Sequence, residues 1–269
     1  MSRLVICPTP IGNLEDVTLR VLGTLREADI VACEDTRRTR KLLDRYGVNA
    51  ELVSYHEHNE RARAQDLIAK IQSGKLVALV SDSGMPLISD PGYVLVTAAV
   101  AAGLAIEVLP GPSAALTALV ASGIPSAQWH FVGFLPRKQN QLEQTLSLSD
   151  TLIAFESPKR VGASLATLAK SDPERQVAVC RELTKVHEEI VRGTAANLAE
   201  RYQQESLRGE VVLVIGPAQK DQSDVILERS LEAARTLQEA GAKPRVAAAV
   251  VSELTGCGTN ELYRELVDN

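Results

Sequence analysis

The stretch from Val77 to Gly92, VALVSDSGMPLISDPG, combines the two kinds of sequence that decide the fold. Its first four residues are apolar without interruption, which is typical of a strand buried on both faces of a parallel sheet. The remainder, Ser81–Gly92, is rich in Gly, Pro, Ser and Asp and predicts a tight loop. Because ligands of open parallel sheets bind beyond the carboxyl ends of the strands, this loop is expected to border a binding cleft.

The same alternation of short apolar runs and amphipathic stretches extends through the first half of the chain. The predicted strands are Leu4–Cys7, Ile30–Cys33, Glu51–Tyr55, Val77–Val80 and Ile106–Leu109. Apolar residues at helical spacing predict helices over Thr18–Arg26, Thr36–Tyr46, Glu60–Ser73, Val94–Ala102 and Ala114–Ala121. Strands that alternate with helices imply crossover connections, and therefore an α/β fold with a mainly parallel sheet.

A second α/β unit is predicted after the turn-forming residues Ser122–Ser126. Its strands are His130–Leu135, Thr151–Phe155, Gln176–Cys180 and Val211–Ile215, with helices near Lys159–Ala169 and Ala195–Gln203. A polar linker, Ala218–Asp224, then leads to a helical segment divided by Gly241 and Gly256–Gly258. The chain is thus expected to hold an N-terminal α/β domain (1–122), a C-terminal α/β domain (123–218) and a helical extension (225–269).

The composition is that of a globular protein long enough for two domains: 269 residues, of which 45% are hydrophobic and 3% aromatic. No apolar stretch approaches the roughly 20 residues that cross a bilayer, and residues 1–6 indicate a first strand, so no membrane association is expected. The net charge of −5 argues against a generic nucleic-acid coat, although a local basic patch could still attract phosphates. The four cysteines form no CxxC pair and favour a reducing, cytoplasmic compartment.

Three more of the predicted strands run directly into turn-forming residues: Cys7 into Pro8–Asn13, Cys33 into Glu34–Thr36, and Leu109 into Pro110–Ala114. One such loop is ordinary in an α/β protein, but four at strand ends, two of them rich in acidic residues, indicate a site. The chain lacks the GxGxxG, GxxxxGK[ST], HExxH and GxSxG patterns. His56-Glu57-His58 has no third ligand in pattern, so no metal is expected.

Seven motifs occur in a characteristic order along the chain: PTPIGNL (8–14), EDTR (34–37), HEHNE (56–60), SDSGMPLISDPG (81–92), PGPSA (110–114), ESPKR (156–160) and RELTK (181–185). This series resembles the tetrapyrrole-methylase-like (class III) methyltransferases and, among them, the ribosomal RNA small-subunit methyltransferase I family. The resemblance is close from residue 3 to about residue 217 and looser in the tail. The chain departs from the family pattern at Ser83, where Ala is usual, and at Met85, where Thr is common and a cofactor contact is in question.

The resemblance implies two α/β domains of the tetrapyrrole methylase type with a cofactor cleft between them, and S-adenosylmethionine as methyl donor. It also implies methylation of the ribose 2′-hydroxyl of a cytidine in the decoding region of 16S ribosomal RNA, in the small ribosomal subunit, by a homodimer. Carried over position by position, the cofactor contacts are Pro10, Ile11, Met85, Ile88, Ser113, Ala114, Phe155, Arg181, Glu182, Leu183, Ile215 and Gly216.

Polar side chains in the same loops are the candidates for chemistry and for RNA contacts. The catalytic candidates are Glu34, Asp35, Asp82, Asp90, Glu182 and Lys185, with Glu156 as a further acid. Helix capping explains Asp35 and Asp90 equally well. The candidates for phosphate contacts are Arg37, Arg38, Arg40, Lys41, Arg137, Lys138, Lys159 and Arg160, for which a solvated basic face is the alternative.

Two other functions fit the sequence. The same fold could methylate a tetrapyrrole or another small molecule, although the few aromatics and the basic segment Arg37–Arg45 disfavour this. The chain could also be a non-catalytic module that binds the cofactor or RNA. In the tail, Val246–Leu254 and Thr259–Leu266 flank Gly256–Gly258 in a manner similar to a helix-turn-helix, which could contact RNA or pack within a dimer.

Overall fold

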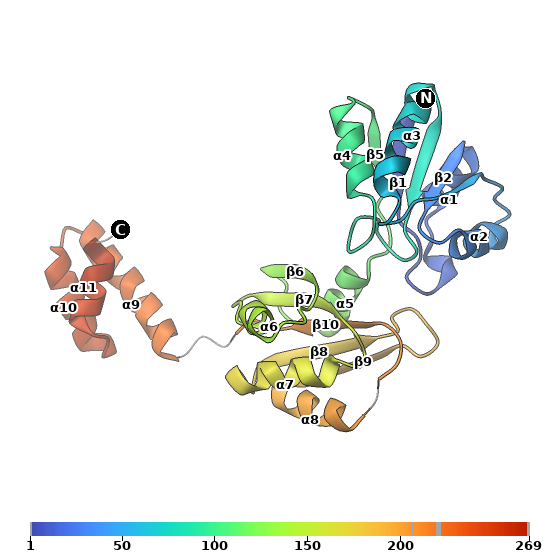
Figure 1. Ribbon diagram of the computed structural model, residues 1–269. Helices are drawn as coiled ribbons and strands as arrows, with labels where there is room; N and C mark the ends of the chain where they lie inside the picture. Colours follow the sequence, from blue (N-terminus) through green and yellow to red (C-terminus); the bar gives the residue numbers. More distant parts are fainter. Residues whose placement is uncertain (1, 206, 219–221, 268–269) are drawn as a thin grey trace. The chain divides into compact units, whose positions relative to one another are not determined.

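The computed structural model describes residues 2–205, 207–218 and 222–267 (Figure 1). The chain divides into two compact units, Met1–Pro217 and Ala218–Asn269. The first unit holds two five-stranded sheets, and the second is helical. Among the described residues, no helix has the length and hydropathy needed to span a membrane.

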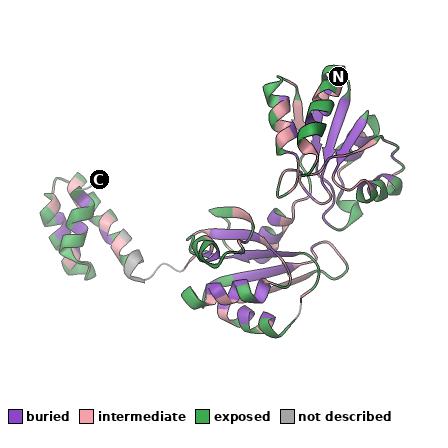
Figure 2. Ribbon diagram, in the orientation of Figure 1, coloured by how far each residue is buried: buried purple, intermediate pink, exposed green. Residues whose placement is uncertain are grey.

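The first sheet is entirely parallel, with strand order β3-β2-β4-β1-β5. Its strands are β1 (Arg3–Cys7), β2 (Ile30–Cys33), β3 (Leu52–Ser54), β4 (Leu76–Val80) and β5 (Ile106–Val108). Helices α1 (Leu19–Glu27) and α2 (Thr36–Arg45) pack on one face. Helices α3 (Glu60–Gln72) and α4 (Tyr93–Ala101) pack on the other. The uninterrupted apolar run of β4 is fully buried, as predicted for a strand covered on both faces (Figure 2).

The point at which the chain changes face lies between β1 and β4, which are neighbours in the sheet. After β1 the chain enters α1 on one face, and after β4 it enters α4 on the opposite face. The loops that leave two adjacent strands in opposite directions open a crevice at the carboxyl edge of the sheet. The loop Ser81–Gly92 stands at this crevice, as the sequence predicts.

The second sheet is mixed, with strand order β6-β7-β10-β8-β9. Its strands are β6 (Trp129–Phe134), β7 (Thr151–Glu156), β8 (Gln176–Arg181), β9 (Glu189–Thr194) and β10 (Val211–Ile215). Only β6 and β7 are parallel, and β10 lies antiparallel between β7 and β8. Helices α6 (Gln139–Leu146), α7 (Val161–Ser171) and α8 (Ala195–Gln204) cover one face.

Helix α5 (Ala114–Ser122) packs on the opposite face of the second sheet, although it follows the last strand of the first. Ala115, Ala118 and Leu119 pack there with residues such as Ile153 and Val214. The helix therefore joins the two sheets into one unit, and the domain limits expected near Ser122 stay a prediction.

The predicted α/β class is confirmed, but two elements of the second sheet were missed. Strand β9 is half-buried at a sheet edge and its short apolar run is flanked by charged residues and a glycine, and α6 is a short polar helix. The mainly parallel arrangement was predicted for the first sheet, where it is confirmed, whereas in the second sheet β8 pairs antiparallel with both β9 and β10.

The second unit contains α9 (Gln222–Glu239), α10 (Pro244–Thr255) and α11 (Thr259–Val267) around a small apolar core. Gly256 ends α10 in the left-handed conformation, as its place in the sequence indicates. Part of the predicted linker, residues 219–221, lies outside the described residues, and α9 begins within the remainder.

Candidate active site

The loops that follow β1 and β4 are fastened to each other. The Thr9 amide donates to the Gly84 carbonyl at 2.9 Å, and the Gly84 amide donates to the Thr9 carbonyl at 3.0 Å. The Thr9 hydroxyl donates to the Ser81 carbonyl at 3.0 Å. Gly84 has a φ of 78°, a conformation that favours glycine. The two loops therefore form one rigid rim at the crevice.

A pocket of about 380 Å³ lies at this rim, between the loops of the first sheet and the edge of the second. It is mostly apolar, and its charged lining residues are all acidic. None of the described residues that line it is a lysine or an arginine. The lining residues are Ile11, Ser83, Gly84, Met85, Ile88, Ser89, Asp90, Ser113, Ala114, Phe134, Phe155, Glu156, Ser157, Pro158, Gly209, Glu210, Val211 and Val212.

Glu156 is a buried carboxylate that organises the second-sheet side of this pocket. Its side chain is 0% exposed, so each of its oxygens needs a partner. The Ser164 hydroxyl donates to it at 2.6 Å, the Ser157 amide at 2.7 Å, and Arg160 lies 3.3 Å away as an ion pair. These contacts fix the turn at Ser157, where the chain lines the pocket.

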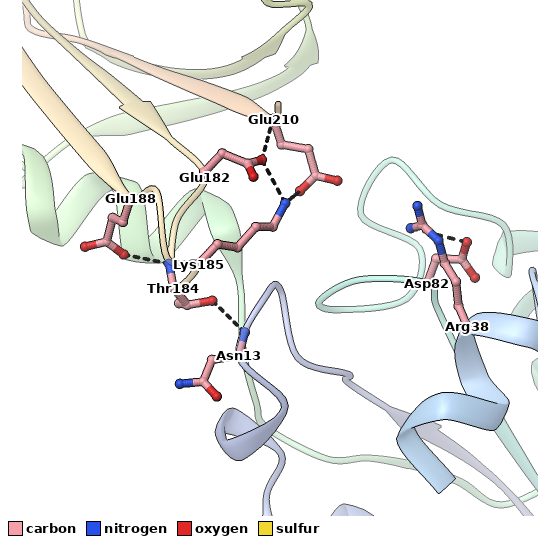
Figure 3. Close-up of polar contacts among 8 residues, drawn as sticks. All are labelled: Asn13, Arg38, Asp82, Glu182, Thr184, Lys185, Glu188 and Glu210. Carbon is pink, nitrogen blue, oxygen red and sulfur yellow. Dashed lines mark hydrogen bonds and ion pairs between the residues drawn. The ribbon is translucent and has the colours of Figure 1, made fainter. Parts of the chain in front are cut away.

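Three charged side chains, those of Glu182, Lys185 and Glu210, lie together (Figure 3). The Lys185 ammonium lies 2.9 Å from Glu182 and 2.9 Å from Glu210. The Glu210 amide donates to the Glu182 carboxylate at 2.9 Å. This amide and then Lys185 hold the pKa of Glu182 below its ordinary value. The cluster places Glu210 at the edge of the pocket and leaves Lys185 fully engaged by two carboxylates.

The segment Glu182–Glu188, called the strap below, runs from β8 to β9 and reaches the loop after β1 (Figure 3). The Asn13 amide donates to the Thr184 hydroxyl at 3.0 Å, and the Thr184 amide donates to Glu188 at 2.6 Å. Glu182 and Thr184 have φ values of 50° and 64°, which non-glycine residues adopt at a cost. The strap thus ties the second sheet to the PTPIGN loop.

The acidic residues after β2 and β4 have distinct positions. The Asp35 carboxylate caps α2 by accepting from the Arg37 amide at 2.8 Å. Asp82 accepts from the Asp35 amide at 2.9 Å and pairs with Arg38 at 3.6 Å (Figure 3). Partial burial, and then Asp82, raise the pKa of Glu34. The carboxylates of Asp35 and Asp82 are therefore engaged in hydrogen bonds and an ion pair within these loops. Glu34 lines a neighbouring cavity.

Asp90 lines two cavities at once: the pocket described above and a second one of about 380 Å³. The second cavity is lined by Glu34, Glu57, Glu60, Ser89, Asp90, Pro91, Gly92 and Tyr93. Burial, and then the nearby carboxylates of Glu34 and Asp82, raise the pKa of Asp90 to about 7. The cap of α4 is Gly92, without a side-chain cap bond, so the capping role considered for Asp90 is absent.

The structure brings half of the predicted cofactor residues into the pocket: Ile11, Met85, Ile88, Ser113, Ala114 and Phe155. Pro10 precedes the lining residue Ile11, and Arg181 pairs with the lining residue Val211, but neither Pro10 nor Arg181, Glu182 and Leu183 line the pocket. Ile215 and Gly216 lie at the other end of the sheet, since β10 is antiparallel to β7 and pairs Val211, not Ile215, with Glu156. Its first residues, Val211 and Val212, line the pocket instead.

The predicted basic residues fall into two groups. Arg37, Arg38, Arg40 and Lys41 are exposed on α2, and Arg137, Lys138 and Lys159 are exposed in loops. Arg160 is used internally, because it donates to the Leu135 and Pro136 carbonyls at 3.2 and 2.7 Å. The role of phosphate contact predicted for these side chains stays a prediction.

Sequence reasoning missed Gly209 and Glu210, Phe134 and Tyr93. Gly209 has a φ of 88°, a conformation that favours glycine, and a Cβ atom there would displace the Glu182 side chain. Gly209 and Glu210 precede strand β10, and this position is a weak sign of a ligand site, because such sites are expected after strands rather than before them. An antiparallel strand reverses that expectation.

Residues 3–199 match the model of the family described as Tetrapyrrole (Corrin/Porphyrin) Methylases. The chain is 46% identical to ribosomal RNA small subunit methyltransferase I of Mesorhizobium japonicum over 98% of this chain and 91% of the relative. It is 40% identical to the protein of that name from Streptococcus pyogenes serotype M1, over 99% of this chain and 95% of the relative.

Two solved structures show the same fold at low sequence identity. The methyltransferase CobJ has a TM-score of 0.63 and 20% identity, covering 82% of this chain and 97% of its own. Uroporphyrin-III C-methyl transferase from Thermus thermophilus, complexed with S-adenosylhomocysteine, has a TM-score of 0.58 and 19% identity, covering 80% and 97%. The rigid strand-end pocket, the family model and the full-length relatives agree: the chain belongs to the tetrapyrrole methylases, within the ribosomal RNA small subunit methyltransferase I family.

Proposed function

We propose that this protein transfers a methyl group from S-adenosylmethionine to the ribose 2′-hydroxyl of a cytidine in the decoding region of 16S ribosomal RNA. The observation that carries the proposal is the pocket at the rim of Ser81–Gly92, in a chain matched over nearly its whole length by ribosomal RNA methyltransferases. The low-identity neighbours contribute only the fold.

The pocket suits this cofactor in size and in charge. A volume of about 380 Å³ falls within the range of small-molecule sites. In the described part of the chain its charged lining residues, Asp90, Glu156 and Glu210, are all acidic, which complements a positively charged ligand. The apolar side chains Met85, Phe155 and others provide the remaining contact surface.

Residues of the chain would hold the cofactor from both sheets. The rim formed by Thr9 and Gly84 presents Ile11 and Met85, and the turn fixed by Glu156 presents Ser157. S-adenosylmethionine supplies a methyl group on a positively charged sulfur, and its transfer leaves a neutral thioether. The chain's own task is then to align an acceptor oxygen and to exclude competing water, and alignment alone can contribute about 7–11 kcal/mol at best.

The acceptor is assigned to ribosomal RNA because of the relatives, and the exposed cations of α2 support it. Arg37, Arg40 and Lys41 are available to phosphates, and Arg38 stands beside Asp82 at the edge of the site. We further propose a cytoplasmic homodimer. Exposed apolar side chains such as Val108 (59%) and Val120 (84%) offer a surface that a second copy would cover.

The test is transfer of labelled methyl groups into small ribosomal subunits from cells that lack this gene. Mass mapping of the RNA is expected to place the label on the ribose of one cytidine. Subunits from cells that possess the gene serve as the matched control and should accept no label. Absence of transfer, under conditions in which S-adenosylhomocysteine binds, contradicts the proposal.

A further inference from the structure

The two cavities share a wall. Ser89 and Asp90 are the residues that line both the pocket assigned to the cofactor and the second cavity. The backbone of Ser89 in this wall has a φ of 66°, a conformation that a serine adopts at a cost. An acceptor bound in the second cavity would therefore meet the methyl donor at Asp90.

The second cavity has the lining of a base-binding site. Tyr93, at the start of α4, is 73% exposed and offers a ring on which a base can stack. Glu34, Glu57 and Glu60 contribute carboxylates, which accept hydrogen bonds from an exocyclic amine. Burial, and then the nearby carboxylate of Glu60, raise the pKa of Tyr55 to about 12, and the Tyr55 hydroxyl accepts from the Leu95 amide at 3.2 Å.

The same charges exclude the phosphate groups of the RNA from this cavity. Its charged lining residues are acidic, whereas the cations of α2 lie outside it, with Arg38 3.6 Å from Asp82. A nucleotide would then enter base first, with its backbone toward α2. Uracil, which has no exocyclic amine, would present its O4 carbonyl oxygen to the carboxylates where cytosine presents the N4 amine, and two acceptors would then face each other.

We propose, on the basis of the proposed function, that the second cavity receives the acceptor nucleoside, one whose base carries an exocyclic amine, and that Asp90 removes the proton of its ribose hydroxyl. The O–H bond breaks toward the Asp90 carboxylate as the ribose oxygen forms its bond to the methyl carbon. The electron pair of the S–CH₃ bond stays on sulfur, and the proton on Asp90 then passes to water. A pKa near neutrality suits a proton acceptor of this kind.

The experiment compares the wild type with Asp90→Asn, Tyr93→Ala and Val100→Ala on small subunits that lack the modification. Val100 lies on the same helix as Tyr93, is 65% exposed and does not line the cavity, so it is the matched control. For Asp90→Asn, kcat should fall about 10²- to 10⁴-fold. For Tyr93→Ala, KM for the subunit should rise roughly tenfold or more, as when a stacked aromatic is removed. The Kd of S-adenosylhomocysteine should change less than about threefold in each variant, because the cofactor pocket keeps its other contacts.

A second readout does not depend on turnover. Ultraviolet cross-linking of the Asp90→Asn protein to the subunit should attach the target nucleotide to the peptide that holds Tyr93. A target changed to uridine should lose this cross-link and methyl transfer together. If the wild type is active but Asp90→Asn and Tyr93→Ala match Val100→Ala, or the target cross-links elsewhere, the inference is overturned while the proposed function stands. An inactive wild type contradicts the proposed function itself, and the inference falls with it.

Discussion

Gly12 lies directly against Thr184: a Cβ atom at residue 12 would be 2.6 Å from the Thr184 hydroxyl oxygen and 2.5 Å from Cγ of Lys185. The adjacent amide, that of Asn13, donates to the same hydroxyl at 3.0 Å. The strap and the loop after β1 are thus in a contact that only a residue without a side chain allows. The glycine of the PTPIGN motif therefore has a packing role between segments far apart in the sequence.

Replacing Gly12 with alanine should separate the strap from this loop. Overpacking of this kind costs about 1–3 kcal/mol of the free energy of unfolding. Urea denaturation checks the value, with Gly23→Ala as control. A Cβ atom on Gly23, within α1, meets nothing within 4 Å, so that change should stabilise the protein by up to about 1 kcal/mol. Equal effects of the two substitutions would contradict the proposed role of Gly12.

Replacing Lys185 with methionine should destabilise the protein in a pH-dependent way. Glu182 has a folded-state pKa below its ordinary 4.5, so its contribution to stability is present above that pH and is lost as the pH falls through the folded value. Removing the ammonium leaves Glu182 and Glu210 without their shared cation. The difference in Tm between wild type and variant should be largest near pH 7 and should shrink as the pH falls below 4.5. A difference that is constant with pH would show that the ion cluster does not cause it.

Replacing Asp90 with asparagine should stabilise the protein while it slows turnover. Asp90 has a folded-state pKa of about 7 against an ordinary 3.8, because burial and then Glu34 and Asp82 disfavour its charge. Its contribution is therefore present at low pH and is lost as the pH rises through about 7. The Tm of Asp90→Asn should match that of the wild type near pH 4 and exceed it at pH 8. If the variant is less stable than the wild type at pH 8, the ionised Asp90 carboxylate does not destabilise the folded protein.

Replacing Arg175 with methionine should be among the most destabilising changes in the second sheet. This buried guanidinium donates to the carbonyls of Gly216, Leu146, Leu148 and Asp150 at 2.7, 2.8, 2.6 and 3.2 Å. Each buried carbonyl left unpaired costs about 1–3 kcal/mol, so a loss of at least about 3 kcal/mol is expected. Chemical denaturation measures it, with Lys170→Met on the exposed side of α7 as control. A loss similar to that of the control would mean that water replaces the guanidinium.

The first sheet and its strand-end loops were predictable because their signals are local. An apolar run indicates a buried parallel strand such as Val77–Val80, and glycines and prolines indicate the loop that follows it. The placing of Ile11, Met85 and Ser113 at one pocket followed from these loops together with the family resemblance.

The second sheet was less predictable because its pairings are decided by tertiary packing. Nothing in the composition of Val211–Ile215 states that this strand runs antiparallel between β7 and β8. The family resemblance placed Ile215 among the cofactor contacts, whereas Glu210 and Val211 line the pocket. Likewise, the sequence does not show which aspartate is free for chemistry. Asp82 accepts from the Asp35 amide and pairs with Arg38, whereas Asp90 lines two cavities.

The packing of α5 has a consequence for the order in which the chain folds as it leaves the ribosome. The first sheet is complete once Val108 has emerged, but the inner face of α5 must wait for the second sheet. That sheet cannot close before its central strand β10, which ends at Ile215, has been made. During synthesis of residues 123–215, Ala115, Ala118 and Leu119 are consequently apolar surface without a partner. Transiently exposed apolar surface of this kind makes a nascent chain prone to aggregation until its partner has been made.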